Sequence, residues 1–383
     1  MKGVPPDLRG RERDGIARRD EVPVAHVDDG GVFTDPGTDD DAGILGVVLV
    51  EDRLQRLGTK LADWQKLHAD GSIHRMSGRS TTAPAVECVP NVSEGRDDAV
   101  IQRLADTIRS VGGVTLMNVH ADPDHHRAVF SFLGAPAKVE AAALALAARV
   151  IELIDMRRHQ GMHPRIGALD VLPFVPLAGI SMAETAALAR RVGESLADRH
   201  EIPVYYYAEA AFHAGRRSLR ALRRGEYEGL AARLATAEGA PDAGPARFEA
   251  RTGAVLVGAR TILVAFNVWL SAGDITVARE IARTVRESSG GLAAVQAMGV
   301  WLASRGIAQV SMNLLDYRAT SMATVFDRVR DEARARGVGV SRSELVGVAP
   351  RAALAGRSPE SIGLIGFTPD LYLDTYLEPS RPV

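Results

Sequence analysis

The sequence predicts an α/β (α+β) fold made of two ferredoxin-like βαββαβ subdomains with a ligand groove between them. From Val86 onward, short apolar runs of strand length alternate with longer amphipathic runs of helix length. Their order is strand, helix, strand, strand, helix, strand, and the same order returns after a Pro- and Gly-rich break. Because 46% of the 383 residues are hydrophobic, the chain can also build a sizeable core.

Each element of the first series has the periodicity of its type, since apolar residues recur three and four apart in the expected helices. A further helix and strand extend this first subdomain. In order, we expect strand 85–90, helix 98–111, strands 114–119 and 127–134, helix 138–154, strand 168–177, helix 181–200 and strand 202–208.

The break at residues 238–253 precedes the second series. Its expected elements are strand 261–270, helix 275–288, strands 293–304 and 307–315, helix 322–337 and strand 343–349. The chain therefore divides into a poorly ordered, polar N-terminal extension (1–84), two subdomains (85–250 and 251–355) and a C-terminal tail (356–383).

Composition narrows the class of partner. The 46 Lys and Arg residues nearly balance 48 Asp and Glu residues, so no net field favours nucleic acid or an anionic membrane. Small molecules or copies of the chain itself are the expected partners. The single cysteine, Cys88, lies in an apolar run and is expected to be a buried thiol in a reducing compartment. With no bilayer-length apolar run and no signal peptide, we expect a cytoplasmic protein.

Four stretches are polar where a core-forming segment would be apolar. In the first, "PNVSEGR", Ser93 or Asn91 is expected to cap the helix that follows, with its amides facing an anionic group. The second, "HADPDHHR", connects two expected strands and contains three histidines and two aspartates. These residue types can ligate a transition metal. A wet loop or an acid/base site is the competing interpretation, and we favour no metal.

The third stretch is "RHQGMHPRIGALD", in which Gly161 and Pro164 exclude a regular helix. His163 precedes Pro164 and is biased to an extended conformation, and Arg165 and Asp170 lie close in sequence. A general acid/base and a structural histidine both fit this pattern.

The fourth stretch is "PDAGPARFEARTGAVLVGAR". Its aromatic ring, arginines and exposed amides suit the binding of a flat heteroaromatic ligand with carboxylates. The alternative interpretation is that the stretch is only a linker.

Segments including "VECVPNVSEGR", "ELIDMRRHQGMHPRIGALDVLPFVP", "RRGEYEGL", "PDAGP" and "QVSMNLLDY" together resemble the glutamate formimidoyltransferase family. The resemblance runs from about residue 86 to about residue 354 and favours the stand-alone bacterial form, without a cyclodeaminase module. It implies a homodimeric transferase of one-carbon metabolism and histidine degradation. The implied reaction moves a formimidoyl group from N-formimidoyl-L-glutamate to N5 of the co-substrate tetrahydrofolate.

The resemblance also implies residue roles. The family's proton-donating histidine falls on His163, which leaves His159 as a bystander. The chemistry of the reaction, and not the resemblance, suggests supporting residues. Asp122 or Asp124 could stabilise the cationic amidine, and Arg127 or Arg165 could hold the donor's carboxylates. His120 is a further supporting candidate. The family's folate-contacting segment falls on Gly244, Pro245, Ala246, Arg247, Phe248, Glu249, Ala250, Arg251, Thr252 and Gly253.

Two departures from the family's pattern bear on the donor. Met162 stands where members usually have a glutamate before the histidine, and His120 stands where the animal enzymes have an aspartate. Fewer carboxylates should weaken the preference for a cationic donor. A different donor, such as formimidoylglycine or a formylated amine, and a catalytically silent folate-binding relative are therefore the alternatives.

Overall fold

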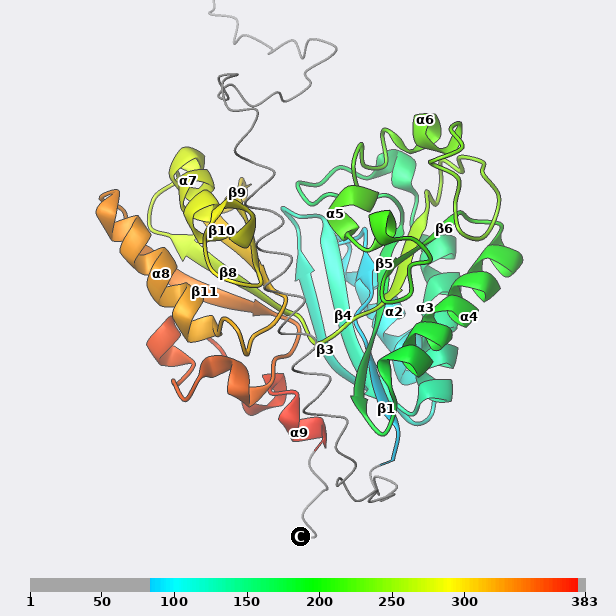
Figure 1. The fold of residues 1–383 in the computed structure, drawn as a ribbon, viewed down its shortest axis with the longest axis horizontal. Helices are drawn as coiled ribbons and strands as arrows, with labels where there is room; N and C mark the ends of the chain where they lie inside the picture. The colour runs from blue at the N-terminus through cyan, green and yellow to red at the C-terminus, as the bar shows by residue number, and fades with distance from the viewer. Residues whose placement is uncertain (1–82, 378–383) are drawn as a thin grey trace, which may run out of the picture. The chain divides into compact units, whose positions relative to one another are not determined.

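The computed structural model describes residues 83–377, so all but the last two residues of the expected N-terminal extension lie outside the described residues. Its first sheet has seven strands (Figure 1). β1 and β2 both pair with β4 and β5, and together they form one interrupted central strand. The strands are β1 (Ala85–Cys88), β2 (Asn91–Val92), β3 (Val114–Asp122), β4 (Arg127–Gly134), β5 (Leu169–Ala178), β6 (Val204–Ala208) and β7 (Val255–Ala259).

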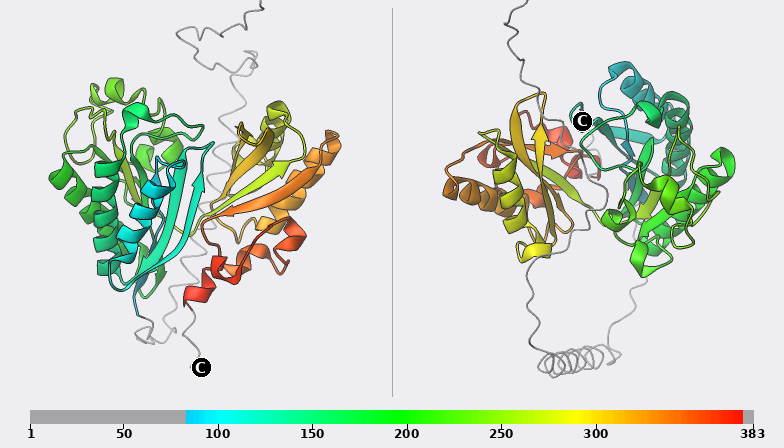
Figure 2. Two further views of the ribbon diagram at one scale, coloured as in Figure 1. Left: turned by 180° about the vertical axis from the view of Figure 1, so that it is seen from behind. Right: turned by 90° about the horizontal axis from the view of Figure 1, so that it is seen from above.

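The order β3, β4, β1/β2, β5 is that of a ferredoxin-like unit, and all of these pairs are antiparallel. Helices α2 (Asp98–Arg109), α3 (Pro136–Leu153) and α4 (Met182–His200) cover one face of the sheet (Figures 1 and 2). Their apolar stripes pack on the strands in one continuous core. Cys88 lies in this core as a buried free thiol, as the sequence predicts.

One strand contradicts the prediction. β7 (Val255–Ala259) lies inside the fourth polar stretch, which the sequence presented as irregular or as a linker. It is fully buried and runs parallel between β5 and β6. A parallel strand that is covered on both faces has a continuous apolar sequence instead of an alternating one. β7 has only five residues and lies next to glycines, so its sequence alone did not indicate a strand. The first sheet therefore continues to Ala259, beyond the expected division at residue 250.

The second sheet has the order β11, β8, β10, β9, all antiparallel, with α7 and α8 on one face (Figures 1 and 2). This is the second ferredoxin-like unit, and it confirms the predicted fold class. Its elements are β8 (Val264–Leu270), α7 (Ile275–Val285), β9 (Val295–Leu302), β10 (Ile307–Leu314), α8 (Met322–Ala335) and β11 (Val340–Val346).

Short helical segments complete the described chain. The segments are η1 (Met156–Arg158), η2 (Ala214–Arg216), α5 (Leu219–Leu222), α6 (Leu230–Leu234), η3 (Glu287–Ser289), η4 (Arg351–Leu354), η5 (Glu360–Ile362), η6 (Pro369–Leu371) and α9 (Asp374–Leu377). Leu373, within the expected C-terminal tail, is buried against Met117 and Leu133 of the first sheet, so that part of the tail is packed.

None of the helices within residues 83–377 has the length and apolarity that crossing a bilayer demands.

Helix α4 begins with a capping box, which yields a stability prediction. The Ser181 side chain accepts from the Glu184 amide, and the Glu184 carboxylate accepts from the Ser181 amide at 2.8 Å. Replacing Ser181 by alanine should lower the free energy of unfolding by about 1 kcal/mol, because a helix-end amide loses its partner. Urea unfolding measures this loss. Ser181→Thr, which keeps the hydroxyl, is the control, and equal losses in both variants would contradict the capping explanation.

Candidate active site

The turn between β3 and β4 is shorter than the sequence suggested. His120 and Asp122 belong to β3, and only residues 123–126 form the turn. The Asp122 carboxylate accepts hydrogen bonds from the amides of Asp124 and His125, both at 2.8 Å. His126 adopts a left-handed conformation with φ 50°. This tight turn sets the direction of Arg127, the first residue of β4.

The first polar stretch is organised differently from the prediction. Neither Asn91 nor Ser93 caps helix α2, because the capping side chain is that of Asp97. Asn91 instead belongs to β2, and Ser93 donates to the Gly167 carbonyl at 2.8 Å. The predicted cap was wrong because the short strand β2 lies between β1 and α2, and Asn91 and Ser93 lie several residues before the helix begins at Asp98. Ser93 consequently ties β2 to the chain that enters β5.

A short polar contact joins His163 to Arg127. Arg127 Nη1 lies 2.6 Å from His163 Nε2, and it also donates to Asn91 Oδ1 at 3.2 Å. A guanidinium can only donate, so Nε2 accepts and the imidazole is neutral. Burial, and then the charges of Arg127 and Arg223, hold the pKa of His163 well below its usual value. The loop and the turn, separated in sequence, thus meet at one imidazole.

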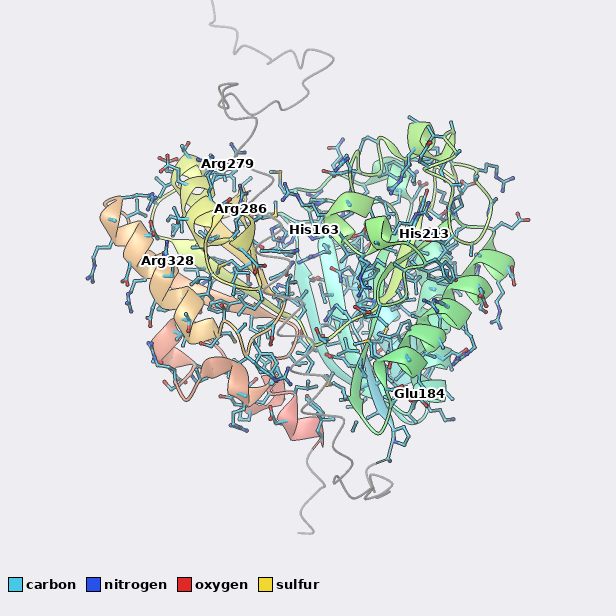
Figure 3. All side chains as sticks on the ribbon, viewed as in Figure 1. His163, Glu184, His213, Arg279, Arg286 and Arg328 are labelled. Atoms are coloured by element: carbon cyan, nitrogen blue, oxygen red, sulfur yellow. The ribbon has the colours of Figure 1, made fainter. Side chains whose placement is uncertain are left out.

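Figure 3 shows His163 on the side of the first subdomain that carries β3 and β4, with His213 and Glu184 at other places in the view. The loop around it is fastened to the turn by His126 and His159. Their rings stack with centroids 4.2 Å apart. His126 Nδ1 contacts the Gln160 carbonyl at 2.9 Å, and His159 Nε2 contacts the His126 carbonyl at 2.8 Å. His159 Nδ1 accepts from Arg165 Nε at 3.2 Å. Burial lowers the pKa of His159 to about 4, so it too is neutral near pH 7.

Arg165 is committed to partners of its own chain. Its buried guanidinium contacts Glu228 at 2.5 Å and Glu226 at 3.2 Å. These three side chains, with Gln160 and Gly161, line an open cavity of about 490 Å³ beside the His163 loop. Arg165 therefore shapes the wall of this cavity, and its charge is already compensated.

Asp122 and Asp124 link the two ferredoxin-like units. Arg305, in the β9–β10 turn, contacts Asp122 at 3.0 Å. Ser304 donates to Asp124 through its amide at 2.9 Å and its hydroxyl at 2.6 Å. His125 receives a longer contact of 3.4 Å from Gln309 of β10. The two aspartates therefore hold the subdomains together, whereas the sequence offered them as partners of a substrate cation.

His120 faces a carboxylate that the sequence analysis missed. Glu344 of β11 places Oε1 3.8 Å from His120 Nε2, and its Oε2 accepts from Asn267 at 3.1 Å. Both side chains are partly exposed. The strand of Glu344, β11, has the sequence VSRSELV, in which several polar residues precede Leu345. Charged residues are typical of an edge strand, so Glu344 did not stand out in the sequence.

The comparisons with known proteins agree with this architecture. The model of the formiminotransferase domain, N-terminal subdomain, matches residues 85–260, and that of the formiminotransferase domain matches residues 265–358. Glutamate formimidoyltransferase of Streptococcus pyogenes serotype M1 is 41% identical over 272 residues, which are 71% of this chain and 91% of that protein. The chain belongs to the formiminotransferase family.

Two further relatives also match over most of the chain. The Thermoplasma acidophilum glutamate formimidoyltransferase is 39% identical over 295 residues, covering 76% of this chain and 97% of that protein. The rat formimidoyltransferase-cyclodeaminase is 43% identical over 275 residues, covering 70% of this chain but 51% of that longer protein. Membership makes this formiminotransferase chain an enzyme, a transferase.

In this formiminotransferase, the segment Gly244–Gly253 runs past the end of α3. Arg251 donates to the carbonyl of Glu152 at 2.6 Å, which satisfies the helix end. Phe248 packs against Tyr227, with ring centroids 5.4 Å apart. The segment is mostly exposed up to Arg251 and buried at Thr252 and Gly253. Aromatic faces and exposed amides are thus present, while the Arg251 guanidinium is occupied.

The histidines of the β3–β4 turn and the His163 loop are not gathered as metal ligands. Across residues 83–377, His, Cys, Asp and Glu side chains form no group of three or more in an arrangement that could hold a metal ion. His125 and His163 have ring centroids 6.1 Å apart, and the other histidines of the turn and the loop contact backbone carbonyls. The described site is therefore an imidazole, guanidinium and carboxylate site.

Proposed function

We propose that this enzyme transfers the formimidoyl group of N-formimidoyl-L-glutamate to N5 of tetrahydrofolate, with His163 as the residue that moves the proton. The observation that carries the activity is the 41% identity to a glutamate formimidoyltransferase over 91% of that protein. Tetrahydrofolate is the co-substrate of the family. The role of His163 is supported by its neutral imidazole and its contact with Arg127.

The reaction needs a proton at the leaving nitrogen. When N5 attacks the amidine carbon, a tetrahedral adduct forms in which N5 carries an extra proton and the carbon still holds glutamate. The glutamate nitrogen would leave as an unstable amide anion unless it is protonated first. A positioned acid or base contributes about a hundred- to ten-thousand-fold in such steps.

Neutral His163 suits both halves of this transfer. Nε2 is the basic nitrogen of this neutral imidazole, so Arg127 must first release its contact with Nε2. Nε2 then accepts the proton from N5 as the new C–N bond forms, and it donates the same proton to the glutamate nitrogen as the old C–N bond breaks. The lone pair of the remaining NH₂ group restores the C=N bond, so atoms and charge balance. A low pKa in the free enzyme keeps the imidazole ready to accept, and the acquired proton is readily given up.

The folate-binding role of residues 244–253 is part of the proposal. Phe248 and Tyr227 offer an aromatic face, and Arg247 is exposed with only a 3.7 Å contact to Glu201. A ring system with attached carboxylates suits such a surface. Arg251 is more simply explained as the cap of α3.

A different donor is the second candidate, and Met162 is the observation that favours it. Its side chain is 57% exposed next to His163, where the family usually has a carboxylate. A less acidic surface favours a neutral donor such as a formylated amine. Formimidoylglycine carries the same cationic amidine as formimidoylglutamate and differs from it in lacking the side-chain carboxylate.

The test is a transfer assay on the purified protein. Wild-type enzyme, tetrahydrofolate and each of the three donors are incubated separately, and the formation of 5-formimidoyl- or 5-formyltetrahydrofolate is followed. We expect the highest kcat/KM with N-formimidoyl-L-glutamate. A higher value with another donor would replace the substrate, and folate binding without any turnover would identify a silent relative.

We also propose that the enzyme works as a cytoplasmic homodimer. A buried, unpaired Cys88 is compatible with a reducing compartment, and the family resemblance supports the dimer. Sedimentation of the full chain distinguishes the dimer from a monomer.

A further inference from the structure

We propose that Glu344 is the binding residue that recognises the positive charge of the donor's amidine, and so separates formimidoyl donors from neutral formyl donors. The inference rests on the proposed function, and it assigns a specificity role to a residue of the second subdomain. The inference depends on the carboxylates around strand β3, the β3–β4 turn and the His163 loop. All but one of those discussed below are paired with a cationic side chain or with backbone amides, and Glu344, which contacts His120 of β3, is the exception.

The other carboxylates of this region have partners. Asp122 and Asp124 are engaged by Arg305 and Ser304. Asp170 contacts Arg223 and accepts from the Ile166 amide. The two glutamates of the cavity, Glu226 and Glu228, contact Arg165, and Glu94 accepts from three backbone amides and faces His126.

Glu344 differs from all of these. Among the described residues, its charged-partner contact is with His120 at 3.8 Å, and its hydrogen bond comes from the neutral amide of Asn267. Burial is the main cause that lowers the pKa of His120, so this histidine is neutral near pH 7. The negative charge of Glu344 is therefore left for a ligand, and its side chain is 23% exposed.

Glu344 also acts electrically on the groups around His163. Burial lowers the pKa of Arg127 and of His125, and the charge of Glu344 opposes that lowering in both. Arg127 contacts His163 at 2.6 Å, and the His125 ring lies 6.1 Å from the His163 ring. Glu344 therefore belongs to the same electrostatic cluster as the proposed proton carrier. An amidinium held by Glu344 would be within the field of that cluster.

The chemistry of the donor fits a carboxylate. A protonated formimidoyl group is planar and carries N–H donors on both nitrogens, so it pairs with a carboxylate by charge-assisted hydrogen bonds. A formyl group has the same size but an oxygen acceptor and no charge. Glu344 would attract the first and repel the carbonyl oxygen of the second.

The experiment compares two ligands by calorimetry without tetrahydrofolate, so that no turnover occurs. N-formimidoyl-L-glutamate and N-formyl-L-glutamate are titrated into wild type and Glu344→Gln, which keeps the Asn267 contact. We expect wild type to prefer the amidine at least tenfold and the variant to lose about tenfold or more of that preference. Glu280→Gln removes an exposed carboxylate from the same subdomain and should leave the ratio unchanged.

The outcomes separate this inference from the proposed function. Glu344→Gln with the wild-type ratio, or wild type with equal affinity for both ligands, would overturn the role of Glu344. The transfer assay on wild type is run in parallel, and absence of 5-formimidoyltetrahydrofolate there would overturn the proposed function instead. Circular dichroism of each variant checks that a lost preference is not lost folding.

Discussion

Replacing His163 by alanine is expected to lower kcat for formimidoyl transfer by about a hundred- to ten-thousand-fold, with a much smaller change in KM. The imidazole is the group placed to carry the proton from N5 to the glutamate nitrogen. Without it, water must serve, and the effect falls on the chemical step rather than on binding. Steady-state kinetics with both substrates varied measure the two constants separately.

The matched control for this prediction is His213→Ala. His213 is an exposed histidine that lies away from His163 in Figure 3, so its loss should leave kcat near the wild-type value. A His163→Ala enzyme that keeps wild-type turnover would remove His163 from the mechanism. A loss confined to KM would make it a binding residue.

Replacing Arg127 by methionine should move the acid limb of the kcat/KM profile to higher pH by about one unit. In the wild type, the pKa of His163 is lowered by burial first and by the Arg127 charge second. The neutral imidazole is the active form, so kcat/KM falls as the pH falls through this pKa. Removing the positive charge raises that pKa, and activity is then lost at a higher pH than in the wild type.

Arg127→Lys provides the comparison, because it retains a positive charge without the planar guanidinium. Its acid limb should lie between those of the wild type and Arg127→Met. Coincident profiles of the wild type and Arg127→Met would mean that the observed limb does not belong to His163. Titration of the His163 ring by NMR reads the same pKa without turnover.

Most of the fold followed from local periodicity. Helices such as α2 and α4 and strands such as β4 were predicted because burying one face imposes a repeat on the sequence. β7 was not predicted, because nothing in its five-residue sequence distinguishes it from a loop. Its status as a strand depends on hydrogen bonds to β5 and β6, whose residues lie far away in the chain.

The sequence by itself determined the two repeated units, and the irregular loop together with the family resemblance singled out His163. Only the tertiary structure decided which charges near that residue are free. Arg127 precedes His163 by 36 residues yet contacts it at 2.6 Å, and Arg305 neutralises Asp122 across 183 residues. Glu344 became visible only because, within residues 83–377, its contacts are a histidine at 3.8 Å and the neutral amide of Asn267. Charge compensation is a property of distances in space, and local sequence patterns do not record those distances.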